Sequence, residues 1–136
     1  MKFGALALPD DLTKMGMTSN EQGGILLGHE HKVHNFTAPG PLDLRGSDLF
    51  VLLDPCHQQA LNESDLDYLG FWHSHPPGTP SEYSAQDLEC WLETAPTMFA
   101  SQPHVNKLYY PIVTGDVIRV WTLDRSLELL ELELRR

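Results

Sequence analysis

The hydrophobic positions of this chain form short runs that polar stretches with Gly and Pro separate. Residues 49–53 are all apolar and end at an Asp-Pro pair, which is typical of a short strand buried on both faces. Residues 68–73 form a second, largely apolar run that predicts a strand. Residues 108–113 and 117–123 flank a Thr-Gly-Asp sequence, and this arrangement predicts an antiparallel pair joined by a tight turn.

Three other segments have weaker strand or loop patterns. Residues 25–33 begin with three aliphatic side chains and predict one continuous strand. Residues 127–134 alternate apolar residues with Glu, which favours a last strand, although a helix is compatible with the same residues. Residues 35–48 are rich in Pro, Gly and Asp and predict a loop or an irregular sheet edge.

Helices are predicted at three places. Residues 9–17 predict a short helix with acidic residues, favourable there, in its first turn. Residues 61–67 predict a helix or a turn before the strand that begins at residue 68. Residues 85–93 predict a third helix with Ser84 as its N-cap. The apolar face of that helix consists of Leu88, Trp91 and Leu92.

Strands and helices therefore interleave along the chain, without an internal repeat, a low-complexity tract or a linker. This order predicts an α/β fold in which helices cover a mixed β-sheet. With 136 residues, the chain can bury about two-thirds of the surface that its unfolded form exposes. We expect a single domain over residues 1–136 with Trp72 and Trp91 in its core.

Charge and composition argue against several classes of partner. A formal net charge of -10 and the lack of a Lys/Arg run argue against nucleic acid and allow a basic or mixed-charge protein partner. No apolar run approaches the ~20 residues of a membrane span, and Pro9 interrupts the N-terminal segment too early for a signal peptide. We expect a cytoplasmic protein in which Cys56 and Cys90 stay reduced. The oligomeric state stays open.

Candidate metal ligands occur between residues 73 and 87. His73 and His75 are two positions apart in an extended segment, so both imidazoles project from one face and can reach one cation about 2.0–2.1 Å away. Asp87 lies in the first turn of a predicted helix, which directs its carboxylate back toward the histidines. Three protein ligands leave the fourth tetrahedral position for water, as in catalytic zinc sites.

The order of Glu21, the sequence His-Ser-His-Pro at residues 73–76 and the sequence Ser-x-x-Asp at residues 84–87 resembles the JAMM metallopeptidases. These proteins are also called MPN-plus or JAB-domain proteins, and the resemblance is greatest to their compact bacterial members. It covers nearly the whole chain and implies a three-layer, cytidine-deaminase-like sandwich. The loop before Ser84 is one residue longer than is usual in the family, but Ser84, unlike Ser81, stands three residues before the aspartate.

The resemblance also implies roles for five residues. His73, His75 and Asp87 would bind one zinc ion per chain, and Glu21 would be the general acid/base for a water that the zinc activates. Ser84 would donate a hydrogen bond to the oxyanion of the transition state. The implied reaction is hydrolysis of a peptide or isopeptide bond after the C-terminal tail of a ubiquitin-like or sulfur-carrier protein.

Two other functions share parts of this pattern. Another zinc amidohydrolase, such as a deaminase, uses His-x-Glu with Pro-Cys-x-x-Cys, and the chain has neither sequence. A non-catalytic interaction module on the same scaffold is the second alternative, against which the complete ligand set argues.

For the remaining histidines, interpretations without a metal ion are simpler. A second metal site at His29, His31 and His34 is conceivable, but a solvated strand end explains this polar segment better. His57 and His104 have no evident partner in the sequence.

Overall fold

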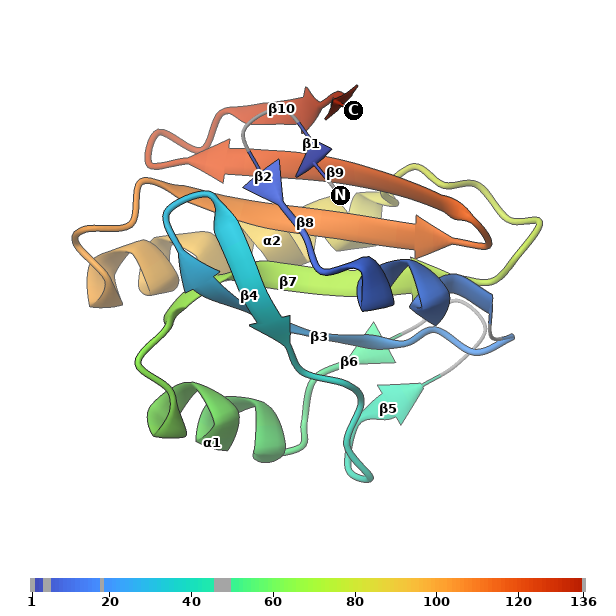
Figure 1. Cartoon of the computed structure of the whole chain (residues 1–136), viewed down its shortest axis with the longest axis horizontal. Coiled ribbons are helices and arrows are strands. Elements are labelled where there is room, and N and C mark those ends of the chain that lie inside the picture. Colours follow the sequence, from blue (N-terminus) through green and yellow to red (C-terminus); the bar gives the residue numbers. More distant parts are fainter. Residues whose placement is uncertain (1, 4–5, 18, 46–49, 136) are drawn as a thin grey trace.

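The structure is a computed structural model that describes residues 2–3, 6–17, 19–45 and 50–135. A nine-stranded sheet passes through the whole molecule in the order β10-β9-β8-β7-β3-β4-β2-β1-β11, and β5 and β6 form a separate pair (Figure 1). In chain order the elements are β1 (Lys2–Phe3), β2 (Leu6–Ala7), the 3-10 helix η1 (Asp10–Met17), β3 (Gly23–His29), β4 (Lys32–Phe36), β5 (Leu44–Arg45), β6 (Phe50–Val51), α1 (Cys56–Glu63), β7 (Asp67–His75), α2 (Ala85–Ser101), β8 (Lys107–Thr114), β9 (Val117–Asp124), β10 (Leu129–Leu132) and β11 (Leu134–Arg135).

Three strands at the centre of the sheet determine where the functional residues meet. β7 pairs antiparallel with β3 and parallel with β8, which makes the sheet mixed. Parallel neighbours need a crossover connection, and α2 provides it between β7 and β8. The end of β7, the start of β3 and the amino end of α2 therefore lie at the same end of the sheet.

The sheet has helices on both faces, as the α/β prediction requires. In Figure 1, α2 lies behind the sheet at β7 and β8, whereas η1 lies in front of the sheet at β7. On the α2 face, Trp91, Ala95 and Phe99 pack onto the sheet in one buried cluster. On the opposite face, Leu12 of η1 packs in a second cluster that includes Trp72. The predicted three layers and the buried positions of Trp72 and Trp91 are thus confirmed.

Most predicted elements are present. The helix predicted at residues 9–17 is present as η1 (Asp10–Met17). Residues 68–73 belong to β7, and residues 108–113 and 117–123 belong to the β8–β9 hairpin. The helix predicted at residues 85–93 begins as expected after the N-cap and continues to Ser101. The last segment is extended, as β10 and β11.

Two boundary predictions were wrong. Residues 25–33 form the ends of two strands rather than one strand, because the chain turns at Glu30, whose φ is 54°. β3 and β4 consequently pair as an antiparallel hairpin. The helix or turn expected at residues 61–67 is the end of α1 and the bend that follows it, and α1 begins earlier, at Cys56, and ends at Glu63.

The strand predicted at residues 49–53 is not buried on both faces. Residue 49 lies outside the described residues, and β6 pairs with β5 in the small two-stranded sheet instead of entering the main one. Leu53 is 56% exposed, whereas Leu52 packs against the α2-side core. A short apolar run that lines a cavity therefore has the same pattern as a strand in a sheet interior.

The cysteines and the helices bear on two further expectations, the reduced thiols and the lack of a membrane span. Cys56 and Cys90 are both free thiols, as expected. Within the part of the chain that the structure describes, every helix is too short or too polar to cross a bilayer.

Candidate metal centre

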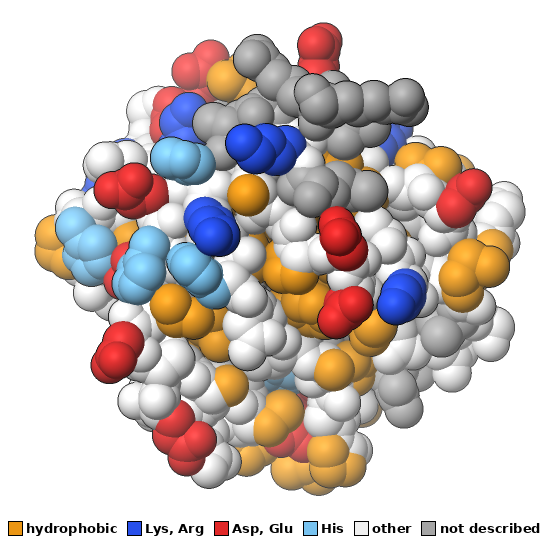
Figure 2. Space-filling model, in the orientation of Figure 1, with side chains coloured by type: hydrophobic (Ala, Val, Ile, Leu, Met, Phe, Trp, Pro, Cys, Tyr) orange, Lys and Arg blue, Asp and Glu red, His pale blue; other side chains and the backbone are white. Residues whose placement is uncertain are grey.

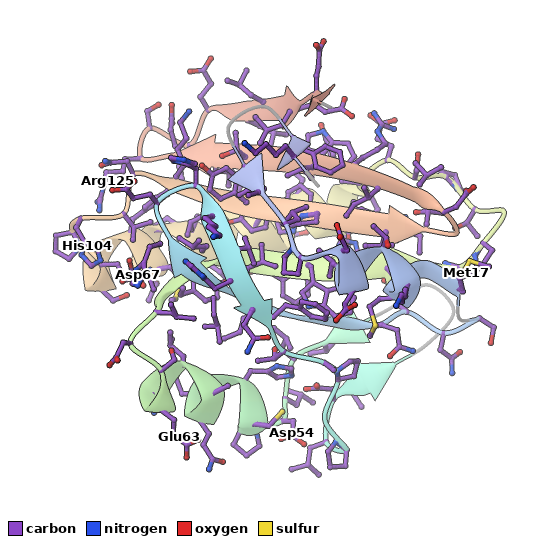
Figure 3. The ribbon with its side chains drawn as sticks, in the orientation of Figure 1. Met17, Asp54, Glu63, Asp67, His104 and Arg125 are labelled. Atoms are coloured by element: carbon purple, nitrogen blue, oxygen red, sulfur yellow. The ribbon has the colours of Figure 1, made fainter. Side chains whose placement is uncertain are left out.

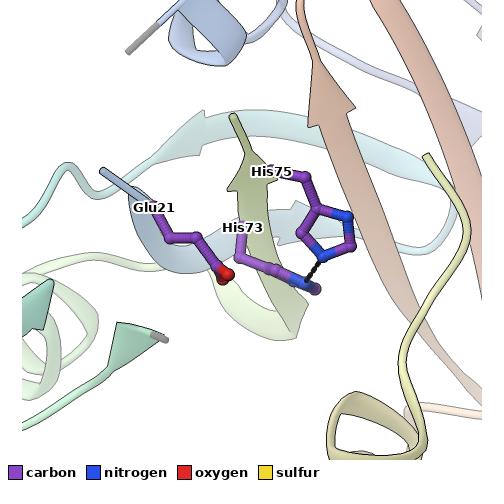
Figure 4. Close-up of side chains that lie close together, drawn as sticks. All are labelled: Glu21, His73 and His75. Carbon is purple, nitrogen blue, oxygen red and sulfur yellow. Dashed lines mark hydrogen bonds between the residues drawn. The ribbon is translucent and has the colours of Figure 1, made fainter. Parts of the chain in front are cut away.

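The candidate metal-binding side chains come from three segments that meet at one end of the sheet. His73 and His75 are alternate residues at the end of β7, and Asp87 lies in the first turn of α2. Glu21 lies two residues before β3, whose first residue, Gly23, is paired with His73. Figure 4 shows Glu21 beside the two imidazoles. All four predicted metal-site residues are thus brought together.

Three potential ligand atoms form a nearly equilateral triangle. Nε2 of His73 lies 3.2 Å from Nε2 of His75 (Figure 4). Oδ2 of Asp87 lies 3.2 Å from Nε2 of His73 and 3.4 Å from Nε2 of His75. Ligands placed about 2.0–2.1 Å from a tetrahedral zinc ion are about 3.3 Å apart. The triangle therefore has the size of three corners of a zinc site.

Hydrogen bonding determines which nitrogen of His75 faces the triangle. Nδ1 of His75 lies 2.8 Å from the carbonyl oxygen of Pro80, and because a carbonyl only accepts, Nδ1 carries the proton. Nε2 of the neutral ring is then an acceptor, like the carboxylate of Asp87. Acceptors that converge on one point repel one another unless a proton or a cation lies between them. This set of converging ligand atoms therefore fits a divalent metal ion.

Ser84 orients Asp87 through a reciprocal capping box. The backbone N–H of Ser84 donates to Oδ2 of Asp87 at 2.8 Å, and the Ser84 hydroxyl accepts from the Asp87 N–H at 3.1 Å. The predicted N-cap is confirmed, and the hydroxyl hydrogen of Ser84 stays available for another acceptor. Ser81 instead accepts a hydrogen bond from Arg119 at 3.4 Å, so Ser84 is the serine that contacts Asp87.

Glu21 is 6% exposed, and its carboxylate lies with the two histidines in a group of ligand atoms within 4.8 Å of one another. Glu21, His73 and His75 can therefore also hold a metal ion. The segment that carries Glu21 is attached to β7 by Ser74. The N–H of Gln22 donates to Oγ of Ser74 at 2.7 Å, and the N–H of Ser74 donates to the Gln22 carbonyl at 2.9 Å.

Sequence reasoning did not assign a role to Ser74, Gln22 or the carbonyl of Pro80. One signal for Ser74 was available, because the residue between His73 and His75 must point to the other face of the strand. Ser74 is fully buried there, and a small side chain with one hydroxyl satisfies the N–H of Gln22. The carbonyl of Pro80 gave no signal, since every residue has a carbonyl.

The side chains of the candidate metal centre are an acid and a base that shift each other's pKa. Burial alone would raise the pKa of Asp87, but hydrogen bonds with His73 and His75 outweigh it and hold that pKa well below its usual range. Burial lowers the pKa of His75, yet its hydrogen bonds with Asp87 and Pro80 raise it above the ordinary value overall. A metal ion must displace a proton from such a site, so acid weakens metal binding.

A cavity of about 310 Å³ opens beside these residues. Glu21, His73 and Asp87 are among its polar lining residues, and most of its lining is apolar. The apolar lining comes from the end of β6 and the residue after it, from β7 and from α2. It includes Val51, Leu52, Tyr68, Phe71 and Trp91. The cavity thus offers an apolar binding surface directly next to the candidate metal centre.

Four histidines lie away from the metal centre on the surface, and Figure 2 shows histidine side chains gathered at one side of this face. Nε2 of His104 lies 2.8 Å from Oδ1 of Asp67, and both residues are labelled in Figure 3. Nδ1 of His29 lies 3.3 Å from Oδ2 of the same Asp67. One carboxylate therefore satisfies both rings, and the expectation that His104 has no partner was wrong. His31 and His34 are exposed, in agreement with a solvated strand end.

His57 was also wrongly expected to have no partner. It is 5% exposed, and its Nε2 lies 2.6 Å from Oδ2 of Asp43, which is 8% exposed. Its other ring nitrogen is hydrogen-bonded to the hydroxyl of Thr37. Both partners are far from His57 in the sequence, so no local pattern pointed to them.

The fold and the site together define an α/β domain with a candidate mononuclear metal centre, and comparison with known families identifies its family. Residues 15–124 match the family model described as prokaryotic homologs of the JAB domain. Because this match covers most of the chain, the protein belongs to the prokaryotic homologs of the JAB domain.

Individual relatives add detail. The CD-NTase/cGAS isopeptidase of Escherichia coli (strain TW11681) is 32% identical, over 55% of this chain and 54% of that protein, so the match spans about half the length of the relative. A solution structure from Desulfitobacterium hafniense has a TM-score of 0.61 at 20% identity, over 93% of this chain and 86% of that one. Another, from Salinibacter ruber, has a TM-score of 0.54 at 21% identity, over 96% and 90%. At this identity, the two structures show the fold alone.

Proposed function

We propose that this protein is a zinc-dependent peptidase or isopeptidase that hydrolyses an amide bond after the C-terminal tail of a ubiquitin-like or sulfur-carrier protein. The observation that carries the proposal is the triangle of His73 Nε2, His75 Nε2 and Asp87 Oδ2, with a buried Glu21 beside it. This arrangement favours an enzyme over a non-catalytic module, because a binding module has no need of converging, desolvated metal ligands.

Two imidazoles and one carboxylate are a donor set that zinc prefers. When bound there, zinc would activate a water for attack on an amide carbon and would polarise the carbonyl. Glu21 would accept the proton of that water and deliver it to the leaving amine. Ser84 would use its free hydroxyl hydrogen to stabilise the oxyanion, while its oxygen keeps the N-cap of α2. Asp87 is proposed as the third ligand, since its Oδ2 lies at tetrahedral spacing from both imidazoles.

Two observations support the substrate class. The relative from Escherichia coli carries the description isopeptidase, and the apolar cavity beside Glu21 can take an extended chain. The net charge of -10 allows a basic or mixed-charge partner surface. Because binding energy from a folded partner is needed to position a flexible tail, whole fusion proteins are better test substrates than short peptides.

The first experiment measures metal. Protein purified without added metal or chelator is analysed by elemental mass spectrometry beside Asp87→Ala and His75→Ala, with His31→Ala as the matched control at an exposed histidine. The proposal expects one zinc per chain in the wild type and in His31→Ala, and loss of zinc in the two ligand variants. Full zinc in both ligand variants would contradict the assigned ligands.

The second experiment measures turnover on linear fusions of ubiquitin-like and sulfur-carrier proteins to a reporter. Cleavage after the tail that stops on removal of zinc and returns on its addition supports the proposal. Zinc-loaded protein that cleaves none of the fusions would favour another zinc amidohydrolase, and protein that neither holds nor takes up zinc would favour an interaction module.

A further inference from the structure

Asp43 and His57 form a second buried pair of ionisable side chains, outside the candidate metal centre. The side chain of Asp43 is fully buried, that of His57 is 6% exposed, and the two lie 2.6 Å apart. A carboxylate that is removed from water costs desolvation energy unless hydrogen bonds compensate for the lost water. The position of this pair in the fold therefore needs an explanation.

Asp43 accepts four hydrogen bonds, which connect two separate parts of one loop. Its Oδ1 accepts the N–H groups of Leu53 and Asp54, both at 2.7 Å. Its Oδ2 accepts the N–H of Gly40 at 2.8 Å and contacts Nε2 of His57. Burial alone would raise the pKa of Asp43, but these hydrogen bonds lower it to about 2, so the side chain is an anion at neutral pH. Two of the four donors immediately follow Leu52.

His57 connects this loop to the sheet through Thr37. The hydroxyl of Thr37 is hydrogen-bonded to His57 and accepts the N–H of Ile25 at 2.9 Å. The carbonyl of Thr37 accepts the indole N–H of Trp72 at 2.9 Å, next to the ligand His73. Thr37 also packs closely against Gly24 of β3, since a Cβ at Gly24 would lie 1.9 Å from the Thr37 carbonyl oxygen. The chain of contacts therefore ends on β3 and β7, beside the metal centre.

The other end of the chain of contacts is the wall of the cavity. Val51 and Leu52 line the cavity together with Glu21 and His73, and the next two backbone N–H groups are those that Asp43 accepts. β6 lies outside the main sheet, so the sheet's hydrogen bonds do not place this wall. We propose that Asp43, His57 and Thr37 are positioning residues that hold the Val51–Leu52 wall against the metal centre.

The proposal has a kinetic consequence that rests on the proposed function. A wall that binds the substrate chain but does not touch the reacting atoms contributes to substrate and transition-state binding alike. Its loss then raises KM and leaves kcat nearly unchanged.

Hydrogen exchange tests the structural part without any substrate. In Asp43→Asn, one oxygen and one NH₂ group replace the carboxylate that accepts four donors, so at least one amide loses its acceptor. The zinc-loaded variant is compared with Asp65→Asn, the same charge change at an exposed position. We expect exchange of the Leu53 and Asp54 amides to become about tenfold faster or more, with unchanged zinc content and unchanged exchange in β8.

Thr37 offers a second test in case Asp43→Asn does not fold. Thr37→Val keeps the shape of the side chain but removes the hydroxyl between His57 and Ile25, whereas Thr37→Ser keeps it. Faster exchange at Leu53 and Asp54 in Thr37→Val, with rescue in Thr37→Ser, is expected. Unchanged exchange in both Asp43→Asn and Thr37→Val would overturn the proposal. Accelerated exchange throughout β3 and β7, together with loss of zinc, would also overturn it.

Turnover of the fusion protein that the wild type cleaves completes the test. Asp43→Asn is expected to raise KM about tenfold and to change kcat by less than about threefold. In a Leu52→Ala background the same substitution should have little further effect on KM, because both changes remove one wall. A fall in kcat with unchanged KM, or additive effects, would refute the positioning role. If the wild type cleaves no fusion, the proposed function fails. Hydrogen exchange still tests whether Asp43, His57 and Thr37 hold the Val51–Leu52 wall in place.

Discussion

Glu21 and Asp87 are two carboxylates near the same pair of imidazoles, and their surroundings suit different tasks. Asp87 receives the N–H of Ser84 and contacts both histidines, which keeps it ionised and fixed, as a ligand must be. Glu21 comes from the segment before β3 and is 6% exposed. The sequence could predict both residues, since each stands in a recognisable pattern. It could not predict the bond between Gln22 and Ser74 that anchors this segment to β7, because it joins residues far apart in the chain.

The role of Glu21 gives the first prediction. Glu21→Gln keeps the size and hydrogen-bonding capacity of the side chain but cannot accept a proton at neutral pH. Turnover should fall by about 10²–10⁴, while elemental analysis should still find the wild-type metal content. If the metal is lost as well, Glu21 is a ligand rather than the base.

Ser74 gives the second prediction. Ser74→Ala leaves the buried N–H of Gln22 without its acceptor, which should lower the free energy of unfolding by about 1–3 kcal/mol. Glu21, the next residue, should lose its fixed position, so kcat should fall more than metal content does. Chemical denaturation and steady-state kinetics measure the two effects, with Ser101→Ala as the control at an exposed serine. Equal stability of the two variants would contradict the anchoring role.

Among the elements, α2 and β6 show how far local patterns reach. The N-terminus of α2 could be predicted because a capping box is a local arrangement of two residues, Ser84 and Asp87. The position of β6 could not be predicted, because residues 49–53 have the apolar composition of an interior strand. The partial burial of Val51 and Leu52 depends on α2 and β7 across the cavity, which are distant in the sequence.

The proposed catalytic role of Ser84, beside its observed role as N-cap, gives the third prediction, which separates capping from catalysis. Ser84→Ala removes both the cap and the hydroxyl, and it should cost about 1 kcal/mol of stability and lower metal affinity by loosening Asp87. Ser84→Asn keeps a good N-cap but has no hydroxyl. If Ser84 stabilises the oxyanion, Ser84→Asn should retain stability and metal and still lose kcat. Full kcat in Ser84→Asn would leave Ser84 with the capping role alone.

For the whole molecule, the mixed sheet brings together segments that the sequence separates by more than sixty residues. Glu21 and Asp87 line the same cavity because β3 and β7 pair antiparallel and α2 crosses over from β7 to β8. An interleaved order of strands and helices predicted this class of fold, but not the strand order. A site built from such distant segments exists only in the native state. Binding at that site therefore stabilises the folded protein.

Metal removal gives the fourth prediction. A metal ion that binds the assembled site and not the unfolded chain stabilises the protein, by about 2.7 kcal/mol when free metal is 100 times its dissociation constant. EDTA should therefore lower the unfolding temperature of the wild type, and added zinc should restore it. The variant Asp87→Ala should show no such shift. Equal shifts in both proteins would place the stabilising metal elsewhere.

Acid stability gives the fifth prediction. The pKa of Asp43 falls from 3.8 to about 2 on folding, so its ionised form stabilises the native state. This contribution is fully present above the unfolded-state pKa and is lost as the pH falls from about 4 to about 2; it corresponds to about 2 kcal/mol. The free energy of unfolding of Asp43→Asn should therefore depend less on pH in this range than that of the wild type. Parallel pH profiles would contradict the assignment.

The sequence by itself determined the features that short-range geometry controls. These are the two imidazoles on one face of a strand, the cap that presents Asp87, the β8–β9 hairpin and the α/β class of fold. The tertiary structure decided the partners of His57 and His104, the bond between Ser74 and Gln22, and the use of residues 51–52 as a cavity wall. The physical reason is that side-chain direction repeats over a few residues, whereas strand register and buried pairs depend on long-range packing.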